Sequence, residues 1–154
     1  MHPESILNQL NIVLPPPAKP VAKYKMAAVV GNIIYISGHG PAKLNEGTPI
    51  KGKVGAELSL ERGIEAAQAV ALNILATLKD QLGNLNRVSR LIKTLGLVNC
   101  TQDFEDQPKV INGFSELMAQ VFGEENGVGA RSAIGTNSLP GNIPVEIECI
   151  FELY

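Results

Sequence analysis

The sequence predicts a single α+β domain in which a mixed sheet carries two helices on one face. Three observations lead to this prediction. Stretches that alternate apolar and polar residues, as strands do, occur near both ends of the chain and in its middle. Two other stretches repeat apolar residues at three- and four-residue steps, the period of a helix that faces a core. The chain has 154 residues, 45% of them hydrophobic, which suits one domain. The predicted order is ββ(β)αβαββ, with the bracketed strand short.

The first 23 residues are expected to form an extension that packs on the body, and residues 24–154 to form the domain. Residues 5–14 contain enough apolar positions for a short amphipathic helix. The proline-rich run 15–20 suits neither a helix interior nor a central strand, so it should follow the surface as extended chain.

A β-hairpin is predicted next. Residues 24–30 and 33–37 read as strands, and Gly31-Asn32 between them tolerates the positive φ that a tight turn requires. The segment 38–41 ends the second strand. A turn at 45–49 and a short third strand at 50–54 are expected to follow.

The sequence then changes to helical periodicity. Ser59 should cap a long helix that ends at Gly83. A longer strand is expected at 87–100 and a turn at 101–103. A second helix should carry Pro108 in its first turn and end at Gly123, followed by a polar loop at 124–129. The apolar positions that carry the second helix are Ile111, Phe114, Leu117, Met118 and Val121.

The last two predicted strands place charged side chains in the sheet. In 145–152 the apolar residues share one face and the other face is mostly acidic, with Glu146 and Glu148. In 130–135 Arg131 and Ala133 share a face, so a guanidinium projects from a strand of small residues. Its planar fork matches a carboxylate or phosphate. The alternative is a cross-strand ion pair of Arg131 with Glu146 or Glu148.

Composition argues against several classes of function. A net charge of -2, a pI near 5.7 and the absence of Trp do not favour a nucleic-acid partner. Cys100 and Cys149 lack CxxC spacing and suit buried, reduced thiols, so a cytoplasmic location is expected. No apolar run reaches the ~18 residues of a membrane span. His2 and His39 have no partner at ligand spacing, so no metal is expected.

Several short motifs occur in a recognisable order. Tyr24 stands seven residues before Gly31, a strand ends at Ser37-Gly38, Ala130-Arg131-Ser132 follows the second helix, and Leu139-Pro140 leads to Val145-Glu146-Ile147-Glu148. From about Tyr24 to Leu153 the chain resembles the reactive intermediate deaminase (Rid) family, also called YjgF-like or L-PSP endoribonuclease-like. The resemblance implies a chorismate-mutase-like fold, a homotrimer with ligand clefts between subunits, and no cofactor.

The resemblance also implies roles for particular residues. Arg131 matches the residue that binds the substrate carboxylate. Glu146 matches the acidic residue that holds the hydrolytic water. Tyr24 matches the aromatic that borders the cleft, near backbone groups at Gly38. Asn112 matches a ligand-bonding Asn, although the segment before it is longer than usual in the family. His39, which follows Gly38, is a further candidate substrate contact.

The activity implied is hydrolysis of enamines or 2-imino acids, such as 2-aminoacrylate, to 2-oxo acids and ammonia. Three departures indicate a divergent branch: Ala133 replaces a frequent Cys, Met26 a Gln near the Tyr, and His39 a Gln after Ser-Gly. A non-catalytic trimer that binds a small carboxylate is therefore the main alternative. Endoribonuclease activity and a purely structural trimer are the other two.

Overall fold

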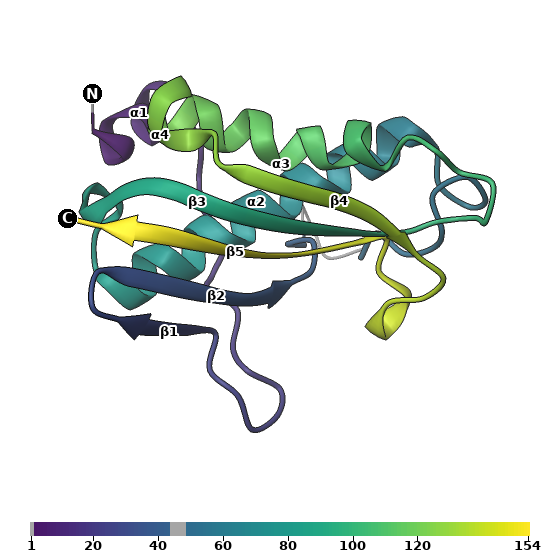
Figure 1. Ribbon diagram of the computed structural model, residues 1–154, viewed down its shortest axis with the longest axis horizontal. Helices are drawn as coiled ribbons and strands as arrows, with labels where there is room; N and C mark the ends of the chain where they lie inside the picture. The colour runs from purple at the N-terminus through teal and green to yellow at the C-terminus, as the bar shows by residue number, and fades with distance from the viewer. Residues whose placement is uncertain (1, 44–48) are drawn as a thin grey trace.

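The structure is a computed structural model that describes residues 2–43 and 49–154. Figure 1 shows one sheet in front of the long helices α2 (Leu60–Leu82) and α3 (Gln107–Phe122). Its strand order is β1-β2-β5-β3-β4. Four neighbouring pairs make this sheet, and only β3 and β4 pair in parallel. The mixed α+β fold predicted from the sequence is confirmed.

The strands follow the predicted alternation. β1 (Ala27–Val30) and β2 (Ile33–His39) form the expected hairpin, in which Gly31 has φ +60°. β5 (Val145–Leu153) lies between β2 and β3 (Val88–Asn99). β4 (Ala130–Thr136) is an edge strand, as β1 is at the opposite edge. Arg131 therefore lies on one edge of the sheet, and the segment that contains Tyr24 leads into the other.

The helix ends are set by the residues that the sequence predicted. The Ser59 side chain accepts a hydrogen bond from the Arg62 N–H at 3.2 Å, which caps α2, and Gly83 ends it with φ +78°. α3 has Pro108 in its first turn and Gly123 at its end. Its five predicted apolar positions are all buried, at 3% exposure or less. Both helices pack on the same face of the sheet.

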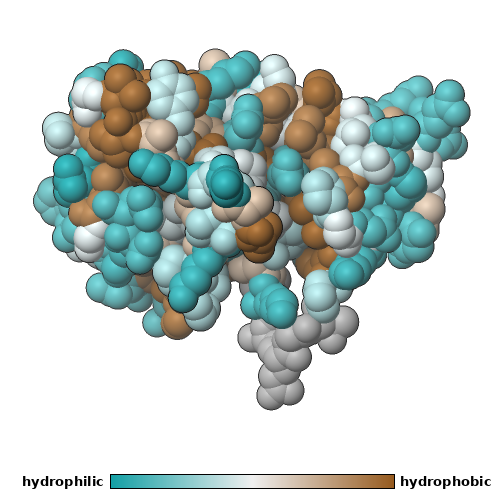
Figure 2. Space-filling view, turned by 90° about the horizontal axis from the view of Figure 1, so that it is seen from below, coloured by the Kyte–Doolittle hydropathy of each residue, from teal (hydrophilic) through white to brown (hydrophobic). Residues whose placement is uncertain are grey.

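The other face of the sheet is open in the single chain. Large apolar side chains on it remain exposed, including Tyr35 (48%) and Ile134 (48%). Figure 2 looks from below Figure 1 onto the side of the molecule where the β1 edge lies, so it shows the open face only edge-on; hydrophobic side chains reach the surface there among hydrophilic ones. A sheet with one uncovered apolar face indicates a contact surface.

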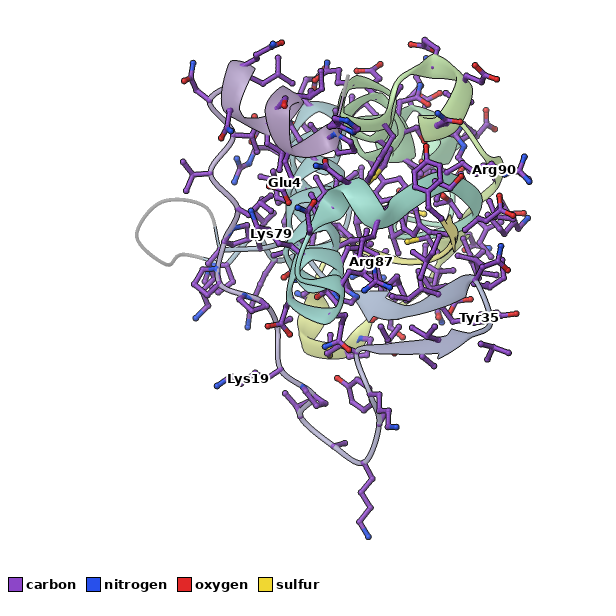
Figure 3. All side chains as sticks on the ribbon, turned by 90° about the vertical axis from the view of Figure 1, so that its left-hand side faces the viewer. Glu4, Lys19, Tyr35, Lys79, Arg87 and Arg90 are labelled. Carbon is purple, nitrogen blue, oxygen red and sulfur yellow. The ribbon has the colours of Figure 1, made fainter. Side chains whose placement is uncertain are left out.

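The N-terminal segment is fastened to the end of α2. Helix α1 (Pro3–Gln9) buries Leu7, and the Glu4 carboxylate accepts hydrogen bonds from Lys79 Nζ at 2.8 Å and the Leu85 N–H at 3.0 Å. Figure 3 shows Glu4 and Lys79 together, and the chain near Lys19 projecting away from the body. The predicted helix is confirmed, although it starts and ends earlier than expected.

Two local predictions are wrong. Residues 50–54 form no strand, because Gly52 and Gly55 have φ +115° and +95°, and only Val54 makes isolated bridges, to Leu58 and Cys100. The expected loop at 124–129 contains the one-turn helix α4 (Glu124–Gly127). Residues 44–48 of the expected turn at 45–49 lie outside the described residues. No helix in the described ranges has the length and apolar character to cross a membrane.

Candidate functional site

Arg131 emerges from the edge strand toward α3. Its Nη1 donates to Asn112 Oδ1 at 2.8 Å and to Ser115 Oγ at 3.2 Å. These two acceptors are three residues apart on α3, so they lie on the same side of the helix. A guanidinium has five N–H donors in a fixed fork. Holding it through Nη1 leaves Nη2 and Nε to meet a ligand. The predicted residues Arg131 and Asn112 are thus brought together, and Ser115 joins them.

Glycines ahead of β4 set the position of this edge. A Cβ at Gly129 would lie 2.8 Å from the backbone oxygens of Leu91 and Ile92, and one at Gly127 would lie 2.3 Å from the Met118 oxygen. Only glycine allows the chain to pass so close to β3 and α3. The packing leaves a cavity of about 160 Å³ next to the guanidinium, lined by Leu91, Thr94, Asn112, Ser115, Gly127, Val128, Gly129 and Arg131.

The expected alternative, an ion pair of Arg131 with Glu146 or Glu148, is wrong. Arg131 lies beside Thr94, which is buried on the helix side of the sheet. Glu146 lies beside Leu97 on the open face. The two charges therefore project from opposite faces. None of the ion pairs found among the described residues includes Arg131, so its charge remains available to an anion.

Glu146 is half-buried and packs against Gly38. A Cβ at Gly38 would lie 3.0 Å from Glu146 Oε2, so any larger side chain would displace the carboxylate. Burial raises the pKa of Glu146 above its ordinary value, and the negative charge of Glu148 raises it further. A carboxyl group with a raised pKa can both accept and return a proton. Glu146 and Gly38, two predicted site residues, are therefore neighbours.

Tyr24 lies on the same side of the molecule as Gly38. The Ser37 hydroxyl donates to the Lys25 carbonyl at 2.6 Å, and the Ser37 N–H donates to the Met26 carbonyl at 3.0 Å. These bonds hold the chain that follows Tyr24 against the end of β2. The Tyr24 side chain is 43% exposed, so it is free to make contacts outside its own chain.

Within one chain the predicted site residues form two groups. The arginine group consists of Arg131, Asn112 and Ser115, and the glutamate group of Glu146, Gly38 and Tyr24. Glu146 lies on the central strand β5 and Gly38 on β2, so Glu146 is two strand spacings from β4, which is about 10 Å at ~4.8 Å per spacing. This separation and the opposite faces of the sheet keep the two groups apart. One chain alone does not assemble the site.

His39 corrects one expectation. Its side chain is 2% exposed and lies on the helix side, because the register of β2 shifts between Ile36 and His39. Nδ1 lies 2.6 Å from the Ser37 oxygen and Nε2 lies 2.8 Å from Thr77 Oγ1. A carbonyl only accepts, so we assign the proton to Nδ1 and let Nε2 accept from the Thr77 hydroxyl. The expected contact of this side chain with substrate is wrong.

Ser115 was missed in the sequence. Its signal would have been the three-residue spacing from Asn112 on a predicted helix, which aligns two short polar side chains. That pattern is common on solvated helix faces. The pattern indicates a site only when Arg131 is known to donate hydrogen bonds to both side chains.

Comparison with known proteins shows the family of the chain. The family model described as "YjgF/chorismate_mutase-like, putative endoribonuclease" matches residues 4–154. A curated relative, Protein TCP17 of Trypanosoma cruzi, is 38% identical over 147 residues, which are 96% of this chain and 91% of the relative.

Two solved structures place the chain within the fold family. The protein Atu1372 of Agrobacterium tumefaciens, described as of unknown function, has a TM-score of 0.88 at 38% identity, covering 99% of this chain and 92% of its own. RidA from the Antarctic bacterium Psychrobacter has a TM-score of 0.57 at 28% identity, covering 90% and 94%. The chain is thus more similar to Atu1372 than to this RidA.

Proposed function

Because the chain belongs to the YjgF/chorismate-mutase-like family, the Rid family, we propose that it hydrolyses reactive enamines and 2-imino acids, such as 2-aminoacrylate, to 2-oxo acids and ammonia. One observation carries the proposal: the arginine group and the glutamate group are complementary and project from opposite faces of the sheet. One group supplies a fixed cation and the other a carboxyl group with a raised pKa.

The proposal includes a homotrimer with the site between neighbouring copies. A contact that joins the β4 edge of one copy to the open face of the next, where Glu146 lies, uses two different surfaces. Repeating such a contact closes a ring when the rotation permits. The uncovered apolar face of the sheet supports this arrangement, since assembly would remove it from water.

In the proposed reaction Arg131 binds the substrate carboxylate through the N–H groups that Asn112 and Ser115 do not use. Glu146 of the neighbouring copy orients a water molecule and takes its proton as the oxygen adds to the C=N carbon. The carbinolamine nitrogen receives this proton, and then the proton of the carbinolamine hydroxyl as the C–N bond breaks, so ammonia leaves and the 2-oxo acid remains. An enamine such as 2-aminoacrylate enters this step as its imine tautomer, after a proton moves from nitrogen to its terminal carbon. Water supplies the oxygen, so no oxidant or reductant is consumed. The Tyr24 side chain forms part of the cleft wall.

Binding without catalysis is the competing proposal. Ala133, which stands where family members often have Cys, favours it, because the surface next to Arg131 differs from the usual one. In that case the cleft would bind a small carboxylate and Glu146 would have no chemical role. Endoribonuclease activity, which the family description mentions, is disfavoured by the net charge of -2 and the lack of Trp.

A coupled assay of ammonia release from freshly generated 2-aminoacrylate tests the proposal. We expect the wild-type protein to accelerate release and Arg131→Ala to lose that acceleration. Arg90→Ala is the matched control, because Arg90 is exposed and pairs with Glu152 at 2.7 Å, away from the arginine group. Equal rates with and without wild-type protein would reject the deaminase proposal. A monomeric mass by light scattering would reject the composite site.

A further inference from the structure

A second cavity lies at the far end of β4 from Arg131. It has a volume of about 840 Å³ and opens where the parallel strands β3 and β4 both end. Its lining consists of Lys53, Cys100, Thr101, Gln102, Gln107, Gly135, Thr136 and Asn137. No member of the arginine group or the glutamate group belongs to it. The cavity is therefore distinct from the proposed deaminase site.

One wall of the cavity carries a lysine in a fixed position. Lys53 Nζ donates to Asn99 Oδ1 at 2.8 Å and to the backbone oxygen of Asn137. Asn99 is 1% exposed, and its own amide donates to Asn142 Oδ1 and the Ile143 oxygen. An ammonium has three N–H donors. Two are used by the protein, which leaves one for a ligand.

The charge of this ammonium is only partly balanced, by the exposed Glu57 carboxylate: hydrogen bonds from backbone N–H groups and, to a smaller extent, the Lys53 charge lower the pKa of Glu57. Both acceptors of the ammonium are neutral, and none of the ion pairs found in the described ranges includes Lys53. The Glu57 carboxylate accepts from the backbone N–H of Lys53 at 2.8 Å instead. A half-buried, restrained cation beside a cavity attracts an anion more strongly than a mobile surface lysine does.

The backbone around Lys53 is restrained as well. The Val54 N–H donates to the Asn99 oxygen at 2.9 Å, and the Thr101 N–H donates to the Val54 oxygen at 3.1 Å. These bonds fasten the segment to the end of β3. The cation is thus preorganised, and ordering it on ligand binding requires little further loss of conformational freedom.

The rest of the lining limits the class of ligand. Five of the eight lining residues carry a hydroxyl or amide group, but much of the exposed lining is apolar, so the cavity suits a small ligand that has both polar and apolar groups. The adjoining loop 103–106 contains three acidic residues, which disfavour a dianion such as phosphate. We propose that this cavity binds a small polar monocarboxylate, with its carboxylate on Lys53 and its hydroxyl or similar groups on the cavity wall.

The test uses the Arg131→Ala protein, so that the proposed deaminase site cannot bind the probe. L-Lactate is titrated and the backbone amides of Thr101, Gln102, Thr136 and Asn137 are followed by NMR. We expect saturable shifts at these amides with L-lactate, weaker ones with inorganic phosphate, and none with lactamide, its uncharged analogue. Absence of saturable lactate shifts would overturn the proposal, and so would tighter binding of phosphate or lactamide.

Two further variants locate the probe, both made in the Arg131→Ala chain. Lys53→Met should weaken lactate binding about tenfold, the effect of losing one charge-assisted hydrogen bond. Lys51→Met is the matched control, since Lys51 is exposed and two residues away, and it should change affinity less than twofold.

If Lys53→Met fails to fold, Gln102→Trp, at an exposed lining position, should block the cavity. Unchanged affinity in a folded Lys53→Met or Gln102→Trp protein would reject the site. Because Arg131 is absent throughout, the outcome is independent of deaminase activity.

Discussion

Replacing Arg131 with alanine should weaken substrate binding strongly while leaving the fold intact. The side chain is exposed in the single chain and bonds only to Asn112 and Ser115 among the described residues. Its removal deletes a charge-assisted, bidentate pair with the substrate carboxylate, a loss of about 2–5 kcal/mol. That corresponds to a decrease in kcat/KM of about thirtyfold or more. The thermal midpoint should stay close to that of the wild type.

Substitutions that change Arg131 or its partners less drastically separate its charge, its shape and its position. Arg131→Lys keeps the charge but not the planar fork, so it should also lose most of the activity. Asn112→Ala and Ser115→Ala each remove one acceptor of Nη1. Each should raise KM with little change in kcat, because the guanidinium remains but is held less firmly. If both variants leave KM unchanged, α3 does not position the arginine.

A mixing experiment tests whether the site is shared between copies. Arg131→Ala chains keep an intact glutamate group, and Glu146→Gln chains keep an intact arginine group. When the two inactive proteins are unfolded, mixed in equal amounts and refolded, about one quarter of the clefts should combine two intact groups in a ring of random order. About one quarter of the wild-type activity should therefore return.

The control for this experiment replaces the Glu146→Gln chain by one that carries both substitutions. That mixture contains no intact arginine, so no activity should return. Native mass spectrometry checks that mixed assemblies have formed. Mixed assemblies without recovered activity would refute the shared site, because a site within one chain cannot be rescued by a neighbour.

Three further predictions concern protonation and thiols. Glu146→Gln should keep ligand affinity in calorimetric titration but lower turnover. Burial and the charge of Glu148 raise the pKa of Glu146, so the ionised carboxylate costs stability at neutral pH. The thermal midpoint of Glu146→Gln should therefore exceed that of the wild type at neutral pH but not at a pH below that pKa. Burial lowers the pKa of His39, so the unfolded chain binds more protons than the folded chain. Urea titrations should show the full contribution to stability above about pH 6.5 and a loss of stability below it. This loss should be smaller in His39→Gln. Cys100 and Cys149 are free and buried, and burial and the charge of Glu148 raise the pKa of the Cys149 thiol. Both should react slowly with a thiol reagent until urea unfolds the protein, and fast labelling of the native protein would contradict this.

Local signals in the sequence predicted most of the fold. The hairpin at Gly31-Asn32 and the caps at Ser59 and Gly83 depend on residues that act within a few positions, and all are confirmed. The strand expected at 50–54 is wrong because Gly52 and Gly55 adopt positive φ, which β-propensity alone does not reveal. Local chemistry therefore predicts elements better than it predicts which apolar runs find a partner in the sheet.

The candidate site was less predictable because it depends on the register between strands. Alternation showed that Arg131 and Ala133 share a face, and that Glu146 and Glu148 share one. It did not show that these two faces are opposite, since that follows from the pairing of β4 with β3 and of β3 with β5. The direction of His39 depends on an irregularity in β2 for which the sequence has no local signal.

The three departures from the family pattern differ in how deeply their side chains are buried. Two of the three departures are internal: His39 is 2% exposed and bonds to Thr77, and Met26 is 8% exposed. Neither side chain is on the surface that a ligand of the neighbouring copy would meet. Ala133 is different, because it is only partly buried and shares the helix-side face of β4 with Arg131. A change in ligand relative to other members should therefore originate next to the guanidinium, where a methyl group replaces a thiol and leaves more room along the strand.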